Sequence, residues 1–193
     1  MSGATWRAAW LIICAAGLGA CAGQRDHFYA LSTLPRAAQP RTGGFTTQVM
    51  LEVSIPNVVD RPEMIIHAGG DRVLVLEHER WVAPLSDLVR QTLARDIERR
   101  RANALVAGRG FDQADAQAVH MNVDLVRMSV EQGGPATVEA HWRIIDPRTK
   151  TDLIGGEIFT APIEGGDYDS TAKAFSTCLA ALADRLVDEL PAH

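Results

Sequence analysis

The sequence lacks three features that would assign it to a particular class of protein. The apolar run near its N-terminus is shorter than the about 20 residues that a membrane-spanning helix needs. Basic residues are not in excess, because the formal net charge is −5, and this charge gives no electrostatic reason to expect a nucleic-acid partner. Cysteine is scarce, with three in 193 residues, and two of these, Cys14 and Cys21, lie near the N-terminus.

The sequence also lacks a recognisable catalytic motif. No Gly-x-Ser-x-Gly nucleophile motif occurs, and Gly69-Gly70 and Gly108-Arg109-Gly110 do not have the spacing of a nucleotide-binding loop. His78-Glu79 is not followed by the second histidine of a zinc-protease helix. We therefore predict no catalytic residue, no metal site and no cofactor.

Isolated titratable residues do not change this prediction. His120 and His141 could approach each other on neighbouring strands, but no third ligand has a recognisable spacing, so we expect both to face solvent. Asp71, Glu77 and Glu79 could supply an acid-base pair, yet nothing in their spacing places two carboxylates across a substrate. We expect them on a solvated edge.

The first 20 residues are interpreted as a removable export signal. Arg7 and the free amine supply a positive start, residues 8–18 supply the apolar stretch, and small residues precede the cut. We predict cleavage between Ala20 and Cys21. Removing 20 of the 193 residues leaves 173, the size of one domain. An ordinary signal peptide followed by a chance cysteine is the alternative.

Leu18-Gly19-Ala20-Cys21 resembles the lipobox of bacterial lipoproteins. The resemblance implies that the Cys21 thiol forms a thioether to diacylglycerol and that the new N-terminus receives an acyl chain such as palmitate. Several acyl chains anchor a protein stably, whereas one binds marginally. Ala22 stands where such lipoproteins carry Asp when they stay in the inner membrane, so we expect the periplasmic face of the outer membrane.

The anchor would lie close to the folded domain. Residues 21–27 form a lipidated tether in this interpretation, and the five residues between Cys21 and His27 span at most about 17 Å. The domain itself would comprise residues 28–193. With Cys14 removed and Cys21 modified, Cys178 has no partner for a disulfide, and its apolar neighbours predict a buried core thiol.

Alternation of apolar and polar residues predicts about seven strands. Residues 32–44 and 108–117, rich in glycine, proline or polar groups, are predicted loops. Short turns such as Gly69-Gly70-Asp71 and Gly133-Gly134-Pro135 predict hairpins. The predicted strands are residues 46–55, 64–67, 73–76, 105–106, 119–125, 138–144 and 153–161.

Two helices complete the predicted fold. One begins near Pro84 and ends at Arg95, Arg99, Arg100 and Arg101, whose charges complement the helix dipole, and the other begins near residue 169. We predict a single-domain α+β fold in which two amphipathic helices pack on a mainly antiparallel or mixed sheet. The tryptophans at 81 and 142, set among apolar positions, are predicted to fill the core.

Several segments together with the lipobox resemble the PqiC-type ABC-transport auxiliary lipoproteins. The more specific pieces are the Asp-Arg-Pro of residues 60–62 and the Arg-Trp-x-x-Pro-Leu of residues 80–85. Phe28-Tyr29-Ala30-Leu31, Ala140-His141-Trp142-Arg143 and Gly166-Asp167-Tyr168 extend the resemblance over nearly the whole mature chain.

The resemblance implies a non-catalytic periplasmic lipoprotein that supports lipid trafficking or membrane integrity. Its implied partners are an MCE-domain protein and the subunits of an ABC transporter, and a homo-oligomeric ring is one implied assembly. The positions carried over are Cys21 as the lipidated residue and Asp60, Arg61, Pro62, Trp81, Pro84 and Leu85 as motif residues. We expect the prolines and the Asp-Arg pair to shape a turn, Trp81 to pack the helix entrance, and exposed members to contact the partner.

Three other functions stay open at the level of sequence. A periplasmic lipid-binding carrier would need a sizeable apolar cavity. A lipoprotein activator of a cell-wall synthase would differ in the partners that it captures. A periplasmic hydrolase would need Cys178 or a histidine as its reactive group.

Overall fold

The computed structural model describes residues 25–35, 44–107 and 117–190. The predicted signal peptide, its cleavage site at Ala20 and Cys21, and most of the predicted loops lie outside these residues. The strands are β1 (His27–Tyr29), β2 (Thr47–Ser54), β3 (Glu63–His67), β4 (Val73–Trp81), β5 (Ala104–Ala107), β6 (Val119–Val130), β7 (Ala136–Asp146) and β8 (Thr151–Ala161). The helices are α2 (Leu85–Arg100) and α3 (Tyr168–Glu189).

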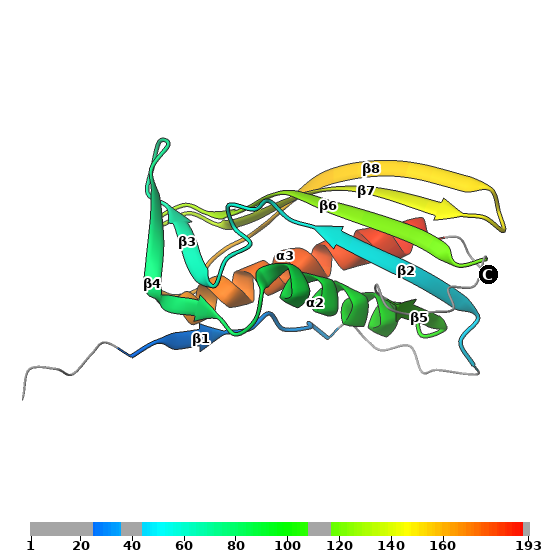
Figure 1. The fold of residues 1–193 in the computed structure, drawn as a ribbon, viewed down its shortest axis with the longest axis horizontal. Coiled ribbons are helices and arrows are strands. Elements are labelled where there is room, and N and C mark those ends of the chain that lie inside the picture. Colours follow the sequence, from blue (N-terminus) through cyan, green and yellow to red (C-terminus); the bar gives the residue numbers. More distant parts are fainter. Residues whose placement is uncertain (1–24, 36–43, 108–116, 191–193) are drawn as a thin grey trace, which may run out of the picture.

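These elements form a single α+β domain with two mixed sheets (Figure 1). The smaller sheet has the order β1-β4-β3, in which β1 runs parallel and β3 antiparallel to β4. The larger sheet has the order β5-β2-β6-β7-β8, with parallel pairing on both sides of β2 and antiparallel pairing from β6 onward. The predicted fold class is confirmed, although the division into two sheets was not predicted.

The two sheets meet where β3 ends beside the end of β6. His67 forms a parallel bridge with Glu131, and the backbone N–H of Gln132 donates to the carbonyl oxygen of His67 at 2.9 Å. This contact joins residues far apart in the sequence, so no local pattern predicts it.

Strict alternation along the strands places the core on one face of the larger sheet. Val49 and Leu51 of β2 and Met121 of β6 are at most 1% exposed, because every second side chain of a strand points to the same side. Both helices lie on this face (Figure 1). Neither helix in the described part of the chain is long and apolar enough to cross a membrane.

A buried arginine links the two helices. The Arg100 side chain, only 3% exposed, bonds to Asp96 Oδ1 on its own helix at 3.0 Å and, through Nε, to Asp184 Oδ1 on α3 at 2.7 Å. Its Nη2 donates to the carbonyl oxygen of Ala180 at 3.1 Å. Arg100 does lie in the last turn of α2, as the dipole interpretation requires, but its burial between the helices was not predicted.

Candidate docking site

The two motif segments that the sequence singled out meet in space at one end of the domain. The backbone N–H of Trp81 donates to the carbonyl oxygen of Pro62 at 2.7 Å, and Asp60 Oδ1 accepts a hydrogen bond from the backbone N–H of Ser86 at 3.1 Å. Ser86 lies in the first turn of α2, whose N-cap residue, Pro84, makes no side-chain cap. Asp60 therefore caps α2 from a distant loop, a contribution of about 1 kcal/mol.

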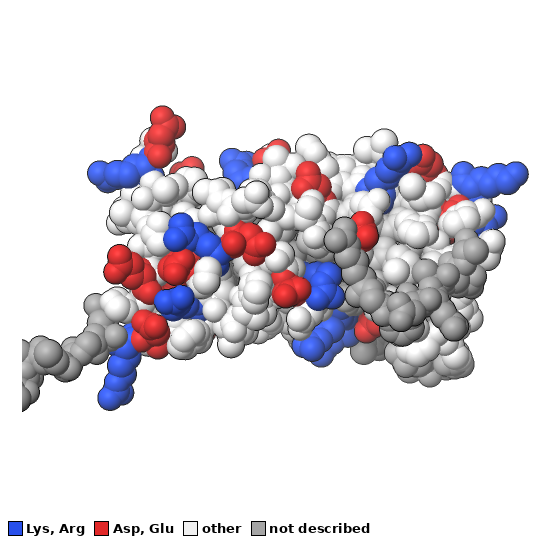
Figure 2. All heavy atoms as spheres, viewed as in Figure 1, with Lys and Arg blue, Asp and Glu red and all other residues white. Residues whose placement is uncertain are grey.

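We call this region, residues 26–29, 58–63 and 79–86, the docking corner. Here Arg61 Nε bonds to Glu63 Oε2 at 3.0 Å, and Arg80 Nη2 lies 3.5 Å from Glu63 Oε1. The hydrogen bond from Arg61 lowers the pKa of the Glu63 carboxyl. Asp60 and Arg61 thus shape the turn through different partners rather than through each other. Acidic and basic side chains are intermixed on the face of the molecule that Figure 2 shows.

The first strand, β1, is held to the docking corner by side chains as well as by its backbone. Tyr29 Oη donates to Glu79 Oε2 at 2.6 Å, and His27 Nδ1 lies 3.2 Å from Glu79 Oε1. The pKa of Tyr29 lies well above its usual value. Burial of the phenol is the larger cause of this rise, and the hydrogen bond to Glu79 is the next. Glu79, which we predicted on a solvated edge, is half-buried in this contact. β1, which follows the predicted tether, is therefore held to β4 by side-chain contacts in addition to its backbone pairing.

The motif residues divide into a buried and an exposed group. Trp81 is 6% exposed, its ring centroid lies 6.4 Å from that of Phe175 on α3, and Leu85 is 2% exposed. The side chains of Trp81 and Leu85 stabilise the start of α2, as predicted for Trp81. The exposed group consists of Asp60, Pro62 and Pro84, with Arg61 at intermediate exposure.

Exposed apolar side chains also belong to the docking corner. Phe28 is 62% exposed, Val58 62% and Val82 58%. Single exposed apolar residues are ordinary on a protein surface. Here they lie within three segments that converge on one corner, so this corner can present apolar contacts to another molecule.

Cys178 has the environment of an inert core thiol, as predicted. It is 1% exposed, and its Sγ lies 3.6 Å from the carbonyl oxygen of Ala136. Burial raises the pKa of the thiol to about 11. Because the thiolate is the nucleophilic form, little of the reactive species forms at neutral pH.

The strand histidines do not form a pair. The register places His141 opposite Asp124 and His120 opposite Ile145, so the two histidines are separated along the strands. Both face solvent, as predicted. Within the described residues, no three His, Cys, Asp or Glu side chains are grouped so that they could hold a metal ion.

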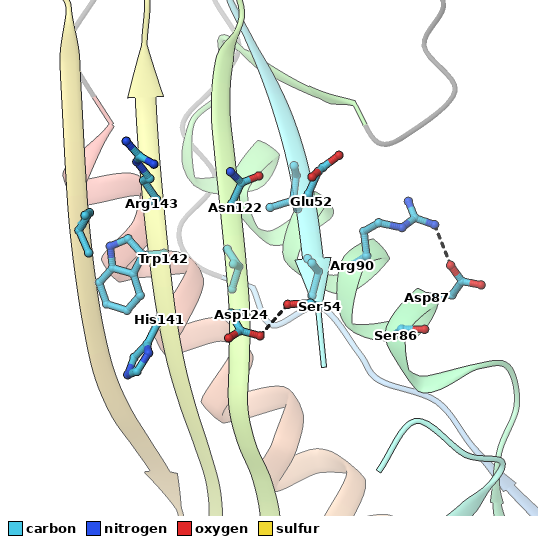
Figure 3. A pocket seen from close by; sticks show the side chains of 14 residues that line it. Glu52, Ser54, Ser86, Asp87, Arg90, Asn122, Asp124, His141, Trp142 and Arg143 are labelled. Carbon is cyan, nitrogen blue, oxygen red and sulfur yellow. Dashed lines mark hydrogen bonds and ion pairs between the residues drawn. The ribbon is translucent and has the colours of Figure 1, made fainter. Parts of the chain in front are cut away.

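An open groove of about 660 Å³ was not predicted, because its lining comes from elements far apart in the sequence. Figure 3 shows polar side chains of β2, β6, β7 and α2 around it. Ser54 Oγ donates to Asp124 Oδ1 at 2.6 Å, and Arg90 Nη2 lies 3.1 Å from Asp87 Oδ1. Charged groups in the lining are costly to desolvate against an acyl chain, so this groove does not favour the lipid-carrier function.

Comparison with known protein families finds one match that covers most of the chain. The family described as the ABC-type transport auxiliary lipoprotein component matches residues 29–187. The matched region begins at Tyr29, the last residue of β1, and contains both motif segments and nearly all of α3. A search of curated proteins finds no match.

Two solved structures share the fold. An uncharacterised protein is 12% identical, with a TM-score of 0.73 over 87% of this chain and 100% of that chain. A DUF330 protein from Xanthomonas campestris is 18% identical, with a TM-score of 0.64 over 83% of this chain and 92% of that chain. At these identities the similarity establishes the fold alone.

Proposed function

The chain belongs to the ABC-type transport auxiliary lipoprotein family, and from this premise we propose that it is a non-catalytic subunit that docks a transport assembly to the outer membrane. The observation that carries the proposal is the family match over residues 29–187. Its transport partners would be an MCE-domain protein and the subunits of an ABC transporter. Through them the protein would support lipid transport and membrane integrity.

The proposed anchor is Cys21, modified by diacylglycerol and an acyl chain. Residues 22–26 separate this cysteine from β1, and five extended residues span at most about 17 Å. Because β1 is bonded to β4 through Tyr29 and Glu79, the short tether would hold the docking corner near the membrane surface.

The proposed partner contact is the exposed part of the docking corner. Val58 and Val82 offer apolar area there, while Asp60 and Arg61 offer charge. Interfaces commonly combine an apolar centre with a polar rim. Trp81 and Leu85, being buried, would act by holding the corner in shape.

In-membrane cross-linking of the full-length protein, followed by affinity capture and mass spectrometry, tests the proposal. We expect an MCE-domain protein and ABC-transporter subunits in the captured material. A Cys21→Ala variant, which cannot be lipidated, should capture several-fold less of them at equal protein abundance. Capture of equal amounts of these partners by Cys21→Ala would contradict the proposed role of the lipid anchor.

The same experiment separates the alternative functions. Recovery of cell-wall synthases in place of transporter subunits would identify a lipoprotein activator. Recovery of phospholipid without any partner protein would identify a carrier. Either result would contradict the docking function.

A further inference from the structure

The last strand of the larger sheet has an open edge in the part of the chain that the structure describes. β8 pairs with β7 over the eleven residues Thr151–Ala161, and no described strand pairs with its other side (Figure 1). Such an edge presents a row of unpaired N–H and C=O groups to another strand. Its length is about twice that of a typical strand.

β8 also lacks the features that usually protect an edge strand. It contains no lysine, arginine or proline, which are common guards against pairing. Its two acidic residues are already paired within the chain: Asp152 bonds to Arg143 at 2.7 and 2.8 Å, and Glu157 Oε2 lies 3.3 Å from Arg185 Nε. No unpaired charge of β8 therefore repels a second strand.

Two large apolar side chains stand on the open face of this strand. Ile154 is 75% exposed and Ile158 is 54% exposed. The carboxylate of Glu157 bonds to Arg185 on α3. Because Ile154 and Ile158 are both an odd number of residues from Glu157, both point to the opposite face of the sheet, away from the helices. Their positions are symmetric about Gly156, as are those of Leu153 and Phe159 on the opposite face.

We propose that β8 pairs antiparallel with β8 of a second copy of this chain, about a two-fold axis at Gly156. In this register Ile154 lies opposite Ile158 of the second copy, and Leu153 lies opposite Phe159 of the second copy. Apolar cross-strand pairs of this kind stabilise a sheet. The two larger sheets then become one continuous sheet with all helices on the same side.

Neighbouring registers are less favourable. An axis at Glu157 places Ile154 opposite Thr160 and Ile158 opposite Gly156, so neither isoleucine has an apolar partner. An axis at Gly155 places Leu153 opposite Glu157 and leaves the isoleucines without apolar partners. The register at Gly156 therefore gives the best match of β8 with itself.

The contact is isologous, because the same surface is used on both copies, and it closes at two copies. A ring would need a second, different surface. None of the residues of β8 belongs to the docking corner, so the pairing is independent of the proposed function.

Cysteine cross-linking of the full-length protein in membranes tests this register. A variant with Ile154→Cys and Ile158→Cys should form a disulfide-linked dimer of identical chains on mild oxidation, with residue 154 joined to residue 158. The matched pair Asp152→Cys and Thr160→Cys, also opposite each other across the axis, should do the same. Neither pair of cysteines can close within one strand, because four residues span about 13 Å and eight residues about 26 Å, whereas a disulfide needs Cα atoms within about 7 Å.

The single variants Ile154→Cys and Ile158→Cys are the register controls. Each should give several-fold less dimer than the double variant, because identical positions are about 13 Å apart in the proposed pair. Equal dimer from the single variants would overturn the register. A link from both double variants to a different protein, or no dimer from either, would overturn the pairing itself.

Discussion

Replacing Arg100 by alanine should lower the free energy of unfolding by about 3–5 kcal/mol, because removal of one partner leaves a buried charge uncompensated. Asp96 is fully buried, and Arg100 is its ion-pair partner at 3.0 Å. Arg100 also joins α3 through Asp184 and Ala180. Urea unfolding followed by circular dichroism would measure the loss.

Arg99 provides the matched control, since it lies one residue away on the same helix and is exposed. Arg99→Ala should change the free energy of unfolding by less than about 0.5 kcal/mol.

The effect of Arg100→Ala should also depend on pH. Burial already raises the pKa of Asp96, and loss of Arg100 would raise this pKa further. A raised pKa in the folded state means stability that is lost as pH rises, so the deficit of Arg100→Ala should be smaller at pH 5 than at pH 7. Equal losses of unfolding free energy in Arg99→Ala and Arg100→Ala would contradict the role of Arg100.

Replacing Gly155 by alanine should destabilise the domain by about 2–3 kcal/mol, as overpacking of a core does. A Cβ at Gly155 would lie 2.6 Å from Trp142 Cζ2 and nearer still to two other ring atoms. The indole cannot easily yield, because Trp142 is 3% exposed and its Nε1 donates to Glu189 Oε2 at 2.5 Å. Thermal unfolding would show a lowered midpoint.

The adjacent glycine is an internal control for this prediction. A Cβ at Gly156 would lie 2.7 Å from His141 Cδ2, but His141 is exposed and its side chain can rotate away. Gly156→Ala should therefore lower the free energy of unfolding by less than about 1 kcal/mol, as is usual for an exposed position. Equal destabilisation by Gly156→Ala and Gly155→Ala would contradict the tight packing of Trp142 against Gly155.

The elements with strong local patterns could be predicted from the sequence. The alternation of residues 46–55 predicted β2, and the 3–4 spacing that follows Pro84 predicted α2. β6 was predicted too short, since it extends to Val130. Its later part includes a register shift between Leu125 and Arg127, which interrupts the simple alternation that marks a strand.

Long-range relations could not be predicted from local patterns. Nothing near Asp60 indicates that it caps α2, and nothing near Arg100 indicates that it meets Asp184 on the other helix. Periodicity reports which face of an element is buried, but it does not report which distant residue lies against that face. The motif resemblance identified the segments of the docking corner, and the structure identified the contacts between them.

The most direct test of the docking account is site-specific photo-cross-linking in membranes from two exposed valines. Val82 lies in the docking corner and is 58% exposed, whereas Val126 lies on β6 and is 43% exposed. A photoreactive residue at position 82 should cross-link to an MCE-domain or ABC-transporter subunit, and the same residue at position 126 should not. Cross-links to these subunits from position 126 alone, or equally from both positions, would contradict the assignment of the docking corner.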